Sequence, residues 1–326
     1  MERDGRQLAF VVGHYKSGTT WLVNLLSLHP DLRGLAETHV FRYALDGKGP
    51  ADTTEQLYHR VAWAGGGPGQ LPRHRLAKWT RRARVGAGLA RGQSTLSDRD
   101  RPIDVLDLAI WDQAALRRKL LACRDGESYI RTFYEFVFDR VRPNRYLVDK
   151  TPTNVPYVPR IRELFPQAKL VVIHRDGRDV VVSDKFHLKR TYHTTEDFRD
   201  RVLKWKAAIE LEEQYVGPFG MFQTSYEAMT ATPKESVRAL LAFLDLPTDD
   251  TTLDDMIHRS SFEFITGRKQ GQEDTSGFYR KGVAGDWVNH YSDQEKEEFG
   301  KLAGDVLVRF GYETSADWRQ WPTKGA

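Results

Sequence analysis

Short apolar runs alternate with amphipathic segments along most of the chain. Four runs have the length and composition of buried strands: 8–12, 146–148, 169–173 and 221–224. Other segments have the three- to four-residue apolar spacing of helices: 19–28, 155–164, 178–188, 198–215 and 233–244. Strands that alternate with helices predict an α/β fold with a central parallel sheet flanked by helices.

The chain between the first two predicted strands departs from this alternation. Residues 47–98 are rich in Gly and Arg and predict loops and short helices, whereas 103–122 has a plainer helical pattern. We therefore expect one domain over residues 1–326 with an insertion at about 47–146. The insertion carries a basic cluster: Arg73, Arg75, Lys78, Arg81, Arg82, Arg84 and Arg91. This cluster is typical of a solvated basic face, and it suggests the hypothesis of an anionic or saccharide-like ligand.

Composition excludes several classes of protein. The chain has 326 residues, of which 40% are hydrophobic and 29% charged, as is ordinary for a globular protein. Its single cysteine, Cys123, cannot form an intrachain disulfide, which favours a reducing, cytoplasmic compartment. No apolar run reaches membrane-spanning length, so we expect a soluble protein with no membrane partner. No nucleic-acid-binding signature accompanies the net charge of +4, which mildly favours anionic ligands.

A glycine-containing segment separates the first predicted strand from the first predicted helix. From residue 13 it reads Gly-His-Tyr-Lys-Ser-Gly-Thr-Thr-Trp. A strand-to-helix turn exposes backbone N–H groups, and the helix dipole favours an anion there. Lys16 adds positive charge, and nearby hydroxyl groups add donors, so the segment predicts a phosphate cradle. It nearly matches the pattern of P-loop NTPases, but Thr19 stands where those proteins have a lysine.

Two further basic motifs carry the same chemistry. Arg175 follows the predicted strand 169–173, and Ser183 lies eight residues later. An arginine at a strand end can form two hydrogen bonds to one phosphate, and a hydroxyl can add a third. Near the other end of the chain, the consecutive residues 280–282 are Arg-Lys-Gly. Two cations beside a glycine can approach a phosphate closely with both side chains and backbone.

The three motifs, in this order, resemble those of the PAPS-dependent sulfotransferases, where PAPS is 3′-phosphoadenosine 5′-phosphosulfate. The resemblance spans roughly residues 8–287 and implies a P-loop nucleotide kinase-like fold, PAPS as donor, PAP as product and no metal. The resemblance implies that the 5′-phosphosulfate contacts come from Lys16, Ser17, Gly18, Thr19 and Thr20. It implies that the 3′-phosphate contacts come from Arg175, Ser183, Arg280, Lys281 and Gly282. It places Trp21, Tyr226 and Phe262 beside the adenine. One departure is His14-Tyr15, where the family has tyrosine-proline.

The catalytic base has two candidates. Transfer to a hydroxyl or amine requires a group that accepts the acceptor's proton. The segment 37–41, Glu-Thr-His-Val-Phe, resembles one that carries a glutamate base in carbohydrate-type members, so Glu37 is the first candidate. His39 is the alternative, because histidine serves in the small-molecule branch. The segment Asp149-Lys150-Thr151-Pro152 resembles another found near the sulfuryl group, which implies a supporting electrostatic role for Lys150.

The sequence thus predicts a sulfotransferase that acts on a small-molecule or saccharide-like acceptor, with the oligomeric state left open. One alternative is a P-loop kinase, which would need a carboxylate for magnesium, and Asp149 is available for that role. The other is a non-catalytic nucleotide-binding protein. No histidine or cysteine spacing of a zinc site occurs in the sequence.

Overall fold

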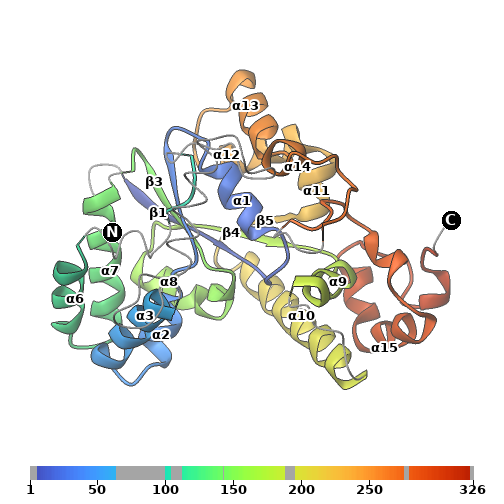
Figure 1. Ribbon diagram of the computed structural model, residues 1–326, viewed down its shortest axis with the longest axis horizontal. Coiled ribbons are helices and arrows are strands. Elements are labelled where there is room, and N and C mark those ends of the chain that lie inside the picture. The colour runs from blue at the N-terminus through green and yellow to red at the C-terminus, as the bar shows by residue number, and fades with distance from the viewer. Residues whose placement is uncertain are drawn as a thin grey trace.

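A five-stranded parallel sheet forms the centre of the computed structural model (Figure 1). Its strand order is β2-β3-β1-β4-β5, and every neighbouring pair is parallel. The strands are β1 Gln7–Val12, β2 Leu32–Leu35, β3 Tyr146–Lys150, β4 Lys169–His174 and β5 Phe222–Ser225. The structure describes residues 6–63, 100–103, 112–141, 143–187, 195–274 and 279–323. The predicted α/β fold with a central parallel sheet is confirmed.

Helices cover both faces of this sheet (Figure 1). Strand β1 shows why, because its apolar side chains alternate between two separate cores. On one face pack α2 Val40–Asp46, α3 Pro50–Trp63, α6 Gln113–Leu121, α7 Gly126–Val141 and α8 Val158–Leu164. On the other face pack α1 Thr19–Leu26, α12 Pro233–Phe243 and α13 Asp250–Ser260. A strand covered on both sides is an almost continuous apolar run, as residues 8–12 are.

A third core lies beside the sheet. In this core the last part of the chain packs against helices from the middle of the chain. It joins α9 Gly177–His187, α10 Thr195–Val216 and α15 Asp293–Arg309 around buried aromatic rings. The Arg178 guanidinium lies between two of them, 3.8 Å from the Trp287 ring and 4.8 Å from the Trp321 ring. The remaining elements are short: α11 Tyr226–Ala231, α14 Phe262–Thr266, and the 3₁₀ turns η1 Pro152–Tyr157, η2 Asp286–Asn289 and η3 Trp318–Gln320.

One predicted element is wrong at its start. The helix expected over 103–122 begins only at Gln113 among the described residues, and Ile103 instead forms a parallel bridge with Leu35. The Ile103 N–H donates to the Gly34 carbonyl at 2.8 Å, so this residue extends the sheet beyond β2. Residues 64–99 and 104–111, which include the basic cluster, lie outside the described residues.

The described part of the insertion packs into the body of the fold. Three side chains on α7 are fully buried: Phe133, Tyr134 and Val137. They lie in the core that also contains Phe10 of β1. Cys123 is partly buried against this core. None of the helices in the described ranges is both long enough and apolar enough to span a bilayer.

Candidate active site

The carboxyl ends of all five strands meet at one edge of the sheet, and each end leads into a predicted site residue. The phosphate loop follows β1, Glu37 follows β2, and Lys150 ends β3. Arg175 follows β4, and Tyr226 follows β5. Next to this edge lies a cavity of about 650 Å³. Open parallel sheets bind their ligands at this edge, so the topology alone brings distant motifs together.

The phosphate loop has the backbone that its glycines permit. Gly13 and Gly18 have φ of 142° and 94°, and Lys16 between them has φ of 69°. A Cβ on Gly13 would lie 2.3 Å from the Ile173 carbonyl oxygen, so no larger residue fits there. Gly18 caps the N-terminus of α1, the end at which a helix favours an anion. Burial lowers the pKa of Lys16 to about 8, and the negative charge of Glu37 opposes this shift.

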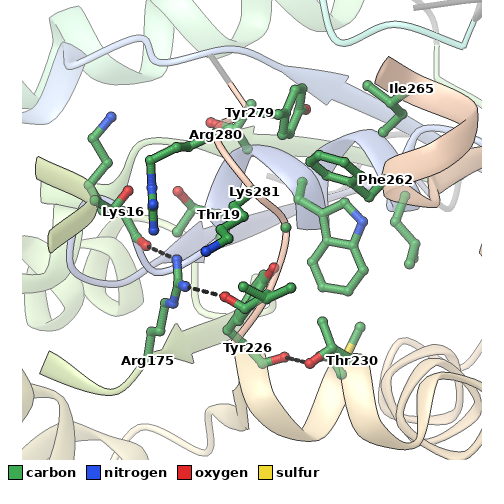
Figure 2. A pocket seen from close by; sticks show the side chains of 18 of the residues that line it. Lys16, Thr19, Arg175, Tyr226, Thr230, Phe262, Ile265, Tyr279, Arg280 and Lys281 are labelled. Carbon is green, nitrogen blue, oxygen red and sulfur yellow. Dashed lines mark hydrogen bonds between the residues drawn. The ribbon is translucent and has the colours of Figure 1, made fainter. Parts of the chain in front are cut away.

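Arg175 is a buried cation with one buried counter-ion. Its Nη2 donates to Asp179 Oδ2 at 3.2 Å and to the Val283 carbonyl at 3.0 Å. The guanidinium lies 4.3 Å from the Tyr226 ring centroid, and Figure 2 shows it directed toward Lys16. Burial would lower the pKa of Arg175, but Asp179 and other anionic neighbours raise it above its ordinary value. The side chain therefore presents a permanent charge to the cavity, which it lines.

The Arg-Lys-Gly loop reaches the same cavity from the far end of the chain. Arg280, Lys281 and Gly282 all line it, and the two cations lie beside Arg175 and Lys16 (Figure 2). Gly282 has φ of 69°, and a Cβ there would lie 2.3 Å from the Phe262 ring. This loop can therefore approach Phe262 only because residue 282 is glycine.

Aromatic and aliphatic side chains form the opposite end of the cavity. The indole of Trp21 donates to the Ser260 carbonyl at 2.8 Å and meets the Tyr226 ring edge to face at 5.8 Å. Phe262 and Ile265 on α14 complete this wall (Figure 2). Tyr279 also lines it and accepts a hydrogen bond from Asn24 at 2.8 Å. One end thus suits a planar apolar ring and the other suits anionic groups.

Glu37 lies at the cationic end and is held by two neighbours. Its Oε1 accepts from Lys150 Nζ at 2.8 Å, and its Oε2 lies 3.2 Å from His39 Nε2. Lys150 also donates to the Thr20 hydroxyl at 3.1 Å, which ties the carboxylate to the phosphate loop. The other ring nitrogen of His39 lies 3.2 Å from the Thr153 hydroxyl. Of these side chains, Glu37 and Thr20 line the cavity.

Asp149, at the end of β3, belongs to an internal hydrogen-bond network. It is fully buried and accepts from the hydroxyls of Thr38 at 2.7 Å, Thr151 at 2.7 Å and Tyr134 at 2.9 Å. Burial raises the pKa of Asp149 to about 6, although these hydroxyl groups oppose the shift. The network fixes Thr38 and thereby the backbone next to Glu37.

Glu212 on α10 is a fully buried carboxyl group behind the phosphate loop. Burial raises the pKa of Glu212 to about 8, and the nearby His14 N–H only partly offsets this. Within the described part of the chain, neither carboxyl oxygen makes a well-formed hydrogen bond. The folded state therefore keeps a proton on Glu212 at neutral pH that the unfolded chain releases.

This proton makes stability depend on pH. Between the ordinary glutamate pKa and about 8, the folded state binds one proton more than the unfolded state, so stability falls as pH rises. The slope approaches about 1.4 kcal/mol per pH unit. We expect Glu212→Gln to match the wild type near pH 5 and to exceed its melting temperature at pH 8. Thermal melts at both pH values measure this, and equal differences at the two pH values would contradict it.

Most of the predicted site residues converge on the cavity. Those that line it are Lys16, Gly18, Thr19, Thr20, Trp21, Glu37, Arg175, Ser183, Tyr226, Phe262, Arg280, Lys281 and Gly282. Ser17 is fully buried in the loop, and His39 and Lys150 hold Glu37. None of the described residues between 47 and 146 lines the cavity. Among the described residues no three His, Cys, Asp or Glu side chains are grouped as metal ligands.

Some cavity residues were missed by the sequence interpretation. Tyr15, Asp184 and Arg201 line the cationic end, where Arg201 is ion-paired with Asp184 and lies 3.4 Å from the Tyr15 hydroxyl. Tyr15 could have been predicted as a cavity residue, because it precedes Lys16 in the phosphate loop. Arg201 gave no local signal, because it is one of several charges on a long helix.

The fold and the cavity first define a class: a parallel α/β protein with a phosphate loop after its first strand. A family model described as "Sulfotransferase family" matches residues 9–250, more than half of the chain, and the chain belongs to this family. The resemblance drawn from the motifs is confirmed.

Known relatives and structures agree with this assignment. Protein-tyrosine sulfotransferase A of Caenorhabditis elegans is 34% identical over 113 residues, which are 33% of this chain and 29% of that protein. The chain thus spans less than a third of that relative. Protein-tyrosine sulfotransferase 2 of Gallus gallus is 22% identical over 95% of this chain and 70% of its own length. Mouse sulfotransferase SULT7A1, solved with PAP, shares the fold, with a TM-score of 0.51, 15% identity, and coverage of 94% and 86%.

Proposed function

We propose that this chain transfers a sulfuryl group from PAPS to a hydroxyl or amine of an acceptor and releases PAP. The observation that carries the proposal is one cavity in which three cationic motifs and Glu37 meet. When bound, PAPS supplies a sulfuryl group on a phosphate oxygen, activated for transfer to a nucleophile. The volume of about 650 Å³, with an aromatic wall at one end and the cations of the three motifs at the other, fits an adenine nucleotide with several anionic groups.

The residues divide the work of such a transfer. Lys16 and the N–H groups of the loop offset the charge that develops on the departing phosphate oxygen. Glu37 takes the acceptor's proton while the acceptor oxygen or nitrogen attacks sulfur in line with that departing oxygen. Lys150 fixes the Glu37 carboxylate, because its ammonium bridges Glu37 and Thr20. Arg175 and the Arg-Lys-Gly loop bind the 3′-phosphate.

The contacts of Glu37 and His39 favour Glu37 as the base. Glu37 lines the cavity, whereas both ring nitrogens of His39 face protein atoms, one toward Glu37 and one toward Thr153. His39 then orients Glu37 together with Lys150.

Two alternatives make different predictions. A P-loop kinase would use the carboxylate at the end of β3 for magnesium, but Asp149 is fully buried and accepts three hydroxyl hydrogen bonds. Thr19 also stands in place of the kinase lysine. A non-catalytic binding protein would bind nucleotide without turnover and would need no carboxylate beside Lys16. Metal independence stays a prediction.

The acceptor that we propose is a small molecule or a saccharide. Arg201 and Lys204 also line the cavity, and because an aspartate offsets the charge of each, they offer hydrogen-bond donors to a polar acceptor such as a saccharide. The similarity to protein-tyrosine sulfotransferases makes a tyrosyl peptide the second acceptor to test. A panel of sulfated and neutral saccharides, simple phenols and a tyrosyl peptide, assayed for PAP release from PAPS, separates these classes. The cytoplasmic compartment inferred from Cys123 stays a prediction.

The first test is calorimetric binding of PAP, AMP and ATP with and without magnesium. We expect PAP to bind at least about tenfold more tightly than AMP, because a charge-assisted phosphate contact contributes about 1.5–3 kcal/mol. The preference should not need magnesium. Tighter binding of magnesium-ATP than of PAP would support the kinase and remove the proposal.

The pKa of Lys16 gives nucleotide binding a pH dependence. Only the protonated amine attracts phosphate, and burial lowers the pKa of Lys16 to about 8. We expect PAP affinity to be level up to about pH 8 and then to fall by up to about tenfold per pH unit. Calorimetry between pH 7 and 9.5 measures the slope. Lys16→Arg, which stays charged, should lose most of it, and equal slopes in both proteins would refute the assignment.

A further inference from the structure

One buried carboxylate holds both cations of the Arg-Lys-Gly loop from behind. Asp286 Oδ2 accepts from Arg280 Nη2 at 2.5 Å, and its Oδ1 accepts from Lys281 Nζ at 2.6 Å. The Asp286 side chain is only 1% exposed, compared with 13% for Arg280 and 24% for Lys281. Two neighbours complete its shell, Asn289 at 3.1 Å and His290 at 3.0 Å.

Asp286 is ionised in this setting. Burial alone would raise the pKa of Asp286, but the donors from Lys281 and Arg280 hold it well below its ordinary value. Asp286 does not line the cavity, whereas both of its cationic partners do. Asp286 therefore does not contact a ligand in the cavity, but it holds the two cations that line it.

Placing these cations close together costs electrostatic free energy, and the negative charge of Asp286 offsets this cost. Figure 2 shows Arg175, Arg280 and Lys281 directed toward one region of the cavity, and like charges this close repel one another. Asp179 neutralises Arg175 and also accepts from the backbone N–H groups of Gly285 at 2.7 Å and Trp287 at 2.9 Å. Those two residues flank Asp286 in the chain. Two buried carboxylates thus hold the three cations and the backbone of the loop together.

We propose that Asp286 is a positioning residue that presets Arg280 and Lys281 for a 3′-phosphate and thereby sets the preference for 3′-phosphorylated adenine nucleotides. This inference rests on the proposed function. A clamp that is already assembled does not have to order its side chains when the ligand binds, so more of the contact energy appears as affinity. A nucleotide with a free 3′-hydroxyl makes no use of the clamp, and its affinity does not depend on Asp286.

The test is calorimetric binding of PAP and AMP to the wild type, Asp286→Asn and Asp286→Glu. Asp286→Asn keeps the size of the side chain and removes the charge. We expect its PAP affinity to fall by about tenfold or more, with AMP within about twofold. Asp286→Glu restores the charge and should recover PAP affinity to within about threefold. The matched control is Glu273→Gln, which removes the exposed second partner of Arg280 and should leave both affinities within about twofold.

The outcomes separate the inference from the proposed function. A wild type without a preference for PAP overturns the proposed function and this inference with it. A wild type that prefers PAP, with an Asp286→Asn variant that keeps this preference, overturns the inference alone. Equal losses for PAP and AMP also overturn it, because they indicate a merely structural role. If circular dichroism shows that Asp286→Asn does not fold, Asp286→Glu decides: a retained preference supports the inference and a lost one overturns it.

Discussion

Replacing Glu37 with glutamine should lower kcat for sulfuryl transfer by about 10²–10⁴-fold, the usual contribution of a general base. Glutamine keeps the oxygen that accepts from Lys150 at 2.8 Å, so the local structure should persist. It cannot take a proton. PAP affinity should therefore stay within about twofold, because binding and proton transfer are separate contributions. The measurements are initial rates of PAP release with the best acceptor of the panel, and calorimetry with PAP.

His39→Asn is the matched comparison for this prediction. If His39 only orients Glu37, its loss should lower kcat by less than the Glu37 variant does. A larger loss in His39→Asn, with Glu37→Gln close to wild type, would transfer the role of base to His39. Wild-type rates in both variants would show that neither Glu37 nor His39 is the base.

Replacing Arg175 with alanine should have the largest effect on nucleotide binding. The variant loses a charge-assisted phosphate contact, worth about 1.5–3 kcal/mol, and leaves Asp179 buried without its cation. Breaking a buried ion pair costs about 3–5 kcal/mol, so stability should fall as well. The Gly285 and Trp287 N–H groups still donate to Asp179 in this variant. The loss of folding stability should therefore be about 3 kcal/mol. PAP affinity should fall by at least about tenfold.

Calorimetry with PAP and AMP, together with thermal melts, measures both effects. Lys301→Ala is the control, because Lys301 is exposed and forms an ion pair with Glu297 at the surface. It should change neither the affinity nor the melting temperature appreciably. If Arg175→Ala bound PAP as well as the wild type while melting earlier, Arg175 would be structural and the assigned 3′-phosphate contact would be wrong.

The sequence predicted the parts of the fold whose signals are local. Buried strands such as β4 appear as continuous apolar runs, and the phosphate loop is fixed by glycines within a few residues. Strand β2, Leu32–Leu35, was missed, because it contains Arg33 and Gly34 and is defined by its pairing with β3. The aromatic helix α7 was missed as well, although its buried residues recur at helical spacing.

The residues of the candidate site also fall into two groups, those with a local sequence signal and those without one. Residues of the basic motifs that line the cavity, such as Arg175, were predicted from spacing. Residues that act on other side chains were not, and Asp286 is the clearest case. Its role depends on being buried against two cations, which only the folded chain shows. His39 was predicted as an alternative base, but its contacts with Glu37 and Thr153 could not be foreseen from sequence.

The cationic end of the cavity is assembled from opposite ends of the polypeptide. Lys16 lies in the first loop of the fold, and Arg280 and Lys281 lie after its last strand. A nascent chain therefore completes its phosphate loop long before it adds the Arg-Lys-Gly loop. A protein shortened to residues 9–250, the span of the family match, would retain every strand except the first two residues of β1, and it would keep Arg175 but lose Arg280, Lys281 and Asp286. The proposed preference for a 3′-phosphate would therefore be completed late in folding, and it would weaken if the chain after residue 250 were removed or loosened.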